Sequence, residues 1–304
     1  METGEGVVIL IALTKPPFLF MKKLRQIFTE VKEDTIRTPQ ELNQLLWQLI
    51  CYSPKMPVRF QQQQLLDEAE KFSLKAKDNY FAHKELVFNG FKWGNGKHRV
   101  LITHGWGSKA ADFTELITAL REIGNLEIIA FDAPGNGSSE GNLSNLLLYI
   151  EAVEAIILKY GEPDVLIGHS LGGIANMLAI KRMMLKPSLL ISLTPLIRLK
   201  ENFEASMSAA DVSRQAQDAF LESFETCFGK PAAYYNLIDL YNFDGRHWLV
   251  YDQHDLISPY DYILEFLKAN PTIESHNYEN IGHEKIIRSP EITNDVIVQI
   301  RSLG

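Results

Sequence analysis

Residues 168–172 read Gly-His-Ser-Leu-Gly, so a serine stands between two glycines, each two positions away. A serine hydroxyl is a weak nucleophile unless it is exposed, held in position and served by a base. A sharp turn from a strand into a helix provides the exposure, and it requires small residues at both flanking positions. An apolar run at residues 164–167 precedes this segment, and Ile174 and Leu178 follow it at helical spacing. Ser170 is therefore the candidate nucleophile.

A second glycine-rich segment, His-Gly-Trp-Gly at residues 104–107, follows another apolar run upstream of the serine. A main-chain N–H of such a loop, here that of Trp106, can act together with the N–H of Leu171. The pair would stabilise the oxyanion of a tetrahedral intermediate formed on the serine. Taken alone, the segment fits an ordinary strand-to-helix turn equally well, but the serine motif downstream favours an oxyanion hole.

A serine nucleophile also needs a base and an acid, and in this arrangement the acid precedes the histidine along the chain. His283 follows the last expected strand and is the candidate base. Asp252 and Asp255 both follow the strand expected at residues 247–251, and the spacing leaves both open as the acid. Asp252 has a structural alternative, which is to accept N–H groups of its own loop. The side chain of His169 is expected to point away from the site, because successive strand residues alternate in direction.

Apolar runs of strand length recur from residue 85 onwards and alternate with helical patterns. They predict strands at residues 85–93, 99–103, 126–131, 164–167, 188–193, 247–251 and 273–278. This alternation indicates an α/β fold with a mostly parallel central sheet and helices on both faces. Sites in such sheets form at the carboxyl ends of strands, and the candidate residues all follow such ends. Asp112 is expected to cap the helix after the second of these strands.

The alternation stops between residues 197 and 244, which read as helical and contain no strong strand. We interpret residues 197–244 as a small helical cap inserted into an α/β core of residues 81–196 and 245–304. Residues 1–80 are expected to form a helical N-terminal extension, in which one of the helices covers residues 60–72.

An apolar stripe repeats every fourth position through the expected cap. Its members are Val212, Ala216, Phe220, Phe224 and Phe228. A stripe of this kind more often packs against neighbouring helices than lines a substrate pocket, so packing is the favoured interpretation. An insertion at this point would overhang the carboxyl edge of the sheet, and the cap is therefore also expected to influence which substrates fit.

The composition is that of a globular protein, with 46% apolar and 22% charged residues. The formal net charge is −8 and no basic run stands out, which argues against binding to nucleic acid or to an anionic membrane. The two cysteines, Cys51 and Cys227, have no spacing that suggests a disulfide, and they fit a reduced cytoplasmic protein.

Residues 7–13 are apolar, but Glu2 and Glu5 precede them where a signal peptide would carry lysine or arginine. The stretch is also too short for a membrane span, and Pro16 and Pro17 soon interrupt the chain. We therefore expect a cytoplasmic protein that does not insert stably into a membrane.

Five segments together resemble the Ser-Asp-His branch of the α/β-hydrolase superfamily. They are residues 104–107, 132–138, 168–172, 252–259 and 282–283. The resemblance covers residues 85–304 and implies the α/β-hydrolase fold, whereas residues 1–80 resemble no family. It also selects Asp255 as the triad acid, because that residue precedes an apolar pair and a proline as the acid does in this family. One departure is Asn136, where relatives often carry histidine or arginine; this alters the pocket floor and leaves the triad intact.

The resemblance implies an esterase-like serine hydrolase in which Ser170 attacks a carbonyl, His283 takes its proton and Asp255 orients the imidazole. The expected substrate is a carboxylester of a small molecule, and no metal or organic cofactor is expected. Hydrolysis of a thioester, an amide or a carbon–carbon bond, acyl transfer, and a non-catalytic binding role on the same fold stay open as alternatives. Haloalkane or epoxide chemistry would require aspartate at position 170.

Overall fold

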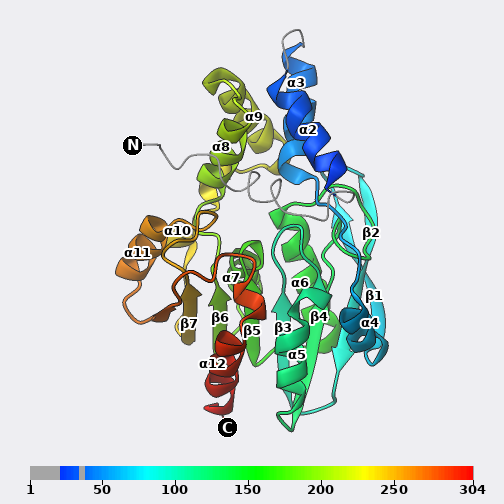
Figure 1. The fold of residues 1–304 in the computed structure, drawn as a ribbon, viewed down its shortest axis with the longest axis vertical. Helices are drawn as coiled ribbons and strands as arrows, with labels where there is room; N and C mark the ends of the chain where they lie inside the picture. The colour runs from blue at the N-terminus through cyan, green and yellow to red at the C-terminus, as the bar shows by residue number, and fades with distance from the viewer. Residues whose placement is uncertain (1–20, 34–37, 304) are drawn as a thin grey trace.

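The computed structural model describes residues 21–33 and 38–303, which form one eight-stranded sheet flanked by helices (Figure 1). The apolar segment 7–13 lies outside the described residues. The strands are β1 (Glu70–Asp78), β2 (Lys84–Trp93), β3 (His98–Thr103), β4 (Leu126–Phe131), β5 (Val165–His169), β6 (Leu189–Leu193), β7 (Arg246–Tyr251) and β8 (Glu274–Asn277). Their order in the sheet is β1-β2-β4-β3-β5-β6-β7-β8.

Strands β3 to β8 pair in parallel, and only β1 and β2 are antiparallel to their neighbours. Every residue of β5 and β6 is buried, as expected for central strands covered on both faces. One face carries α5 (Thr114–Arg121) and α12 (Pro290–Arg301). The other carries α6 (Leu146–Tyr160), α7 (Leu171–Met183) and α11 (Tyr260–Ala269). The predicted α/β fold with a mostly parallel sheet is confirmed.

The N-terminal strand β1 corrects the expected helix at residues 60–72. Helix α4 (Phe60–Asp67) ends before that segment does, and β1 pairs with β2 along its whole length. The sequence did contain a pattern typical of a strand here, because Phe72, Leu74 and Ala76 alternate with polar residues at the period of a strand. The outer strand also carries exposed lysines, which discourage pairing with another sheet.

A layer of helices lies over one end of the sheet (Figure 1). It comprises α2 (Lys22–Lys32), α3 (Pro39–Cys51), α8 (Leu199–Ala209) and α9 (Arg214–Phe228). Trp47 of α3 packs against Phe220, Phe224 and Phe228 of α9, with ring centroids 4.9 to 6.1 Å apart. The cap over the sheet is therefore built from the N-terminal helices together with the inserted ones. The expected aromatic stripe does pack, both against Trp47 of the N-terminal region and against Phe203 of α8.

Two further features bear on the expectations from composition. Cys51 and Cys227 are both free thiols. Among residues 21–33 and 38–303, no helix combines the length and the apolar character that a membrane span needs.

Candidate active site

Ser170 occupies a strained turn between β5 and α7. Its backbone angles are φ 51° and ψ −118°, a region that costs a non-glycine residue energy and that a tightly packed surrounding must enforce. The flanking glycines permit the turn: a Cβ on Gly168 would lie 2.7 Å from the carbonyl oxygen of Gly172, and one on Gly172 would lie 2.3 Å from that of Thr103. The two glycines of the motif are therefore required by close backbone approach.

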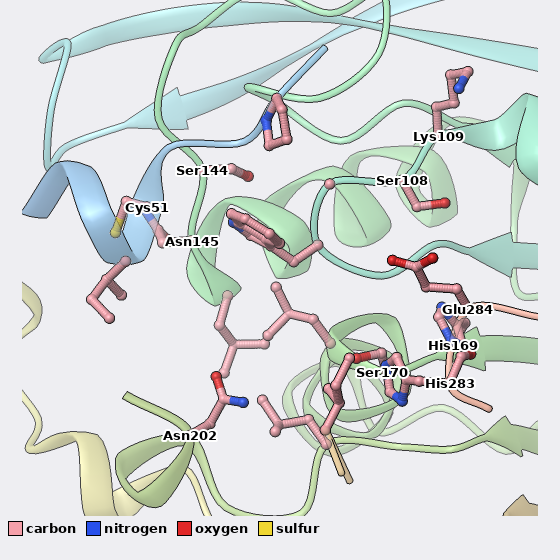
Figure 2. Close-up of a pocket in the computed structure, with 18 of the residues that line it drawn as sticks. Cys51, Ser108, Lys109, Ser144, Asn145, His169, Ser170, Asn202, His283 and Glu284 are labelled. Carbon is pink, nitrogen blue, oxygen red and sulfur yellow. Dashed lines mark hydrogen bonds between the residues drawn. The ribbon is translucent and has the colours of Figure 1, made fainter. Parts of the chain in front are cut away.

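His283 and Asp255 form a tight pair beside this turn. Nδ1 of His283 lies 2.6 Å from Oδ2 of Asp255, and both side chains are less than 10% exposed. Oδ1 of Asp255 accepts the N–H groups of Ile257 and Ser258, which fix the carboxylate. A carboxylate only accepts hydrogen bonds, so Nδ1 carries the proton and Nε2 of His283 has a free lone pair. Figure 2 shows His283 next to Ser170.

Asp252 joins the ends of two loops instead. Its Oδ1 accepts the N–H of His254 at 2.9 Å and its Oδ2 the N–H of Gly282 at 2.7 Å. Burial opposes ionisation of the Asp252 carboxyl, but hydrogen bonds from backbone N–H groups outweigh it and hold its pKa below the usual value. The structure thus places Asp255, and not Asp252, against His283.

His169 corrects the expectation that its side chain points away from the site. Its ring centroid lies 4.8 Å from that of His283, and its Nε2 lies 3.0 Å from the carbonyl oxygen of His283. Because a carbonyl accepts, Nε2 carries the proton and donates. Burial holds the pKa of His169 well below its usual value, with a further contribution from the neighbouring His283, so the ring stays neutral. The strand ends here, and the alternation of directions no longer applies.

The loop at residues 104–107 packs directly against the serine turn. His104 is buried and joins this loop to the neighbouring one: its Nε2 accepts the N–H of Ala133 at 2.9 Å. The hydroxyl of Tyr149 donates to the carbonyl oxygen of Gly105 at 2.9 Å. Trp106 and Leu171 both line the cavity described below. Leu171 is the first residue of α7, so its N–H has no acceptor within the helix.

Asn136 has a structural role that the sequence did not indicate. It is fully buried, and its Oδ1 accepts the N–H of Gly107 at 3.3 Å and the hydroxyl of Ser53 at 2.5 Å. Its Nδ2 donates to Ser144 at 3.0 Å. The residue that departs from the family pattern therefore connects the glycine-rich loop to the N-terminal segment.

A cavity of about 520 Å³ opens between the sheet and the helical layer and contains Ser170, His169 and His283 (Figure 2). Much of the cavity wall is apolar and comes both from the N-terminal helices and from the inserted helices of the cap. These residues include Leu49 and Ile50 of α3, Leu199 and Phe203 of α8, and Phe224 and Phe228 of α9. A volume of this size suits a small organic ligand. No sequence pattern indicated that the N-terminal helices would contribute to it.

Asp112 does not cap a helix, contrary to expectation. It lies in the short 3₁₀ turn η1 (Ala110–Phe113), and no side chain caps α5. Its carboxylate instead accepts from Ser108, Gln62, Lys109 and Arg288 in the wall of the cavity. The expected cap was wrong because tertiary contacts with residues up to 176 positions away hold this side chain.

Comparison with known proteins identifies the family. The model of the alpha/beta hydrolase family matches residues 100–281. A protein of Mycoplasma pneumoniae that is described by name as an esterase/lipase is 24% identical over 242 residues, which cover 68% of this chain and 90% of that protein.

Solved structures show the same fold. An esterase from Pyrococcus furiosus superposes with a TM-score of 0.58 at 16% identity and covers 83% of this chain and 96% of its own. The mouse alpha/beta hydrolase domain-containing protein 10 superposes with a TM-score of 0.60 at 17% identity, over 77% of this chain and 98% of its own. With the family match over residues 100–281 and the sheet order above, the chain belongs to the α/β-hydrolase family.

Proposed function

We propose that this protein is a serine hydrolase that cleaves a carboxylester of a small molecule through an acyl-enzyme. Ser170 is the nucleophile, His283 the general base and Asp255 the residue that orients His283. The observation that carries the proposal is the 2.6 Å contact between Nδ1 of His283 and Oδ2 of Asp255, in the same site as a serine held at φ 51°.

The first half of the reaction follows from these groups. Nε2 of His283 takes the proton of the Ser170 hydroxyl as its oxygen attacks the ester carbonyl. The imidazolium that forms is stabilised by the ionised carboxylate of Asp255, which two backbone N–H groups keep in place. His283 then returns the proton to the departing alcohol, and the acyl group stays on Ser170.

Main-chain N–H groups stabilise the oxyanion that develops when the carbonyl is attacked. We assign this role to Trp106 and Leu171, which line the same cavity as Ser170. Donors of this kind typically contribute about 10²- to 10³-fold to turnover each. His283 activates the water that attacks the acyl-enzyme and releases the acid.

The test is active-site labelling with a fluorophosphonate, followed by a panel of esters and thioesters of graded acyl length. The Ser170→Ala variant should remain folded, lose the label and lose nearly all hydrolysis. Ser73→Ala, on the outer strand β1, is the control and should label like the wild type. If Ser170→Ala keeps wild-type turnover on every ester that is cleaved, the assignment of the nucleophile is wrong.

A further inference from the structure

The wall of the cavity contains two cations that share one carboxylate. Nζ of Lys109 lies 3.3 Å and Nη2 of Arg288 lies 3.0 Å from Oδ1 of Asp112. Gln62 donates to the same oxygen and Ser108 to the other one. Burial opposes ionisation of Asp112, but Lys109 and Arg288, together with the hydrogen bonds from Ser108 and Gln62, outweigh it and hold its pKa below the usual value. The cluster therefore contains one full negative charge and two positive ones.

The surplus positive charge is partly removed from water, because one of the two cations, Lys109, is buried. The side chain of Lys109 is 6% exposed and that of Asp112 10%, while Arg288 is 36% exposed. Within residues 21–33 and 38–303, Lys109 and Arg288 form no ion pair other than those with Asp112. A charge that is removed from water and only partly paired interacts strongly with an incoming ion of opposite sign.

The lining of the cavity carries further charge of the same sign. Arg59 and Lys285 also line it, and Asp112 and Glu284 are the two acidic residues of the lining. The charged lining thus comprises four cations and two anions, whereas the whole chain has a net charge of −8. The net charge of the lining is therefore positive whereas that of the whole chain is negative, so the amino-acid composition of the chain does not account for the charge of the lining.

The charged residues flank the groups proposed to perform the chemistry. Ser108 and Lys109 directly follow the glycine-rich loop, and Lys285 and Arg288 follow His283. In Figure 2, Ser108, Lys109 and Glu284 lie on the same side of the pocket as His283, whereas Cys51 and Asn202 lie across it. Because His283 must give its proton to the leaving group, this side of the cavity is where the alcohol part of an ester would lie.

On the basis of the proposed function, we propose that Lys109, Arg288, Arg59 and Lys285 bind an anionic group, a carboxylate or a phosphate, on the alcohol part of the substrate. The acyl part occupies the apolar region between α3 and α9. Guanidinium groups match the geometry of both anions, and an ammonium group adds a compact charge. The substrate class is therefore an ester between an apolar acid and an alcohol that carries a negative charge.

The test compares three hexanoyl esters that share the acyl chain and differ in the leaving group. They are the esters of 3-hydroxybenzoate, of 3-hydroxyphenyl phosphate and of 3-hydroxybenzamide, the last being the neutral reference. We expect the wild type to show a kcat/KM at least about tenfold higher for one of the anionic esters than for the neutral one, equivalent to one favourable ionic contact. The better of the two anions identifies the group. The preference should decrease as NaCl is added.

For each variant, the readout is kcat/KM for the anionic ester divided by kcat/KM for the neutral ester. Because both values come from the same protein, a change in its overall activity does not affect this ratio. The ratio should fall toward one in Arg59→Gln/Lys285→Gln and in Arg288→Gln. Lys268→Gln removes one charge from the exposed face of α11, outside the cavity lining, and should keep the wild-type ratio.

A wild-type ratio near one, or a ratio that these variants leave unchanged, overturns the inference. In either case Ser170-dependent hydrolysis of the neutral ester would leave the proposed function intact, whereas no Ser170-dependent hydrolysis at all would overturn that function.

Discussion

Nε2 of His169 lies 3.0 Å from the main-chain carbonyl oxygen of His283, so the residue beside the candidate nucleophile holds the backbone of the candidate base. Nδ1 of His169 has no hydrogen-bond partner in the described part of the chain. The ring is buried and neutral, which leaves this single donated bond as its polar contact with residues 21–33 and 38–303. His169 is thus a positioning residue in the proposed mechanism.

Replacement of His169 should lower turnover through the position of His283. His169→Phe removes the donor, and we expect kcat to fall about tenfold with KM little changed, because a small displacement of a base is costly. His169→Gln offers an amide N–H and should recover most of kcat. Steady-state kinetics on one ester, with thermal unfolding to verify the fold, measure this. Equal kcat values in the two variants would contradict a positioning role.

The backbone strain at Ser170 predicts a difference in stability. Ser170→Gly should unfold at higher urea concentration than Ser170→Ala, because alanine keeps a Cβ at φ 51° and glycine does not. Strain of this kind costs about 1–3 kcal/mol, and the greater freedom of glycine in the unfolded chain offsets part of the gain. We expect a net difference of about 1 kcal/mol. An alanine variant at least as stable as the glycine variant would mean that the strain at Ser170 does not exceed this entropic offset.

Asp255 and Asp252 should respond differently to the same conservative change. Asp255→Asn should keep the fold but leave His283 in the wrong tautomer, with a loss of about 10⁴-fold in turnover. Asp252→Asn weakens the bonds to the N–H groups of His254 and Gly282 and should mainly lower stability, by roughly 1–3 kcal/mol. Kinetics and urea unfolding of both variants decide the assignment. An inactive but stable Asp252→Asn beside an active Asp255→Asn would reverse it.

The cap offers a matched pair of aromatic residues on one helix. Phe224 lines the cavity, whereas Phe220, one turn earlier, is fully buried and does not. Phe224→Ala should shift the preference among esters toward longer acyl chains, because it enlarges the apolar wall. Phe220→Ala should cost about 3–5 kcal/mol of stability and leave the chain-length profile unchanged. The measurement is kcat/KM along the ester series, and identical profiles in both variants would exclude Phe224 from substrate selection.

His247 predicts a pH dependence of stability. Burial lowers its pKa from 6.5 to about 3, so below pH 6.5 the unfolded chain binds a proton that the folded one does not. The contribution of His247 to the free energy of unfolding is therefore fully present above pH 6.5. It falls by roughly 1 kcal/mol per pH unit as the pH decreases toward 3. His247→Gln should show a shallower decrease between pH 6 and about 4.5 in urea unfolding. Parallel curves for the two proteins would show that His247 does not cause the effect.

Local patterns in the sequence were enough to predict the turn at Ser170 and the architecture around it. The turn at Ser170 depends on glycines two residues away, and such a requirement is visible in five consecutive residues. Alternating apolar strands and amphipathic helices predicted the parallel sheet. Because the carboxyl ends of parallel strands meet at one edge, His283 and both Asp252 and Asp255 could be placed near Ser170 from the ends of their strands. The family resemblance was needed to select Asp255 from the two.

Only the tertiary structure decided how the rest of the cavity is made. Trp47 packs on Phe224 and Phe228, and Asp112 pairs with Arg288, 176 positions away. Such contacts depend on how helices and loops pack, and no periodicity along the chain records which partner a side chain meets. The direction of His169 was missed for a different reason: its strand ends at that residue, where the alternation of side-chain directions no longer applies. Sequence therefore determined the local geometry of the turn at Ser170, whereas packing between distant segments determined the shape and charge of the space around it.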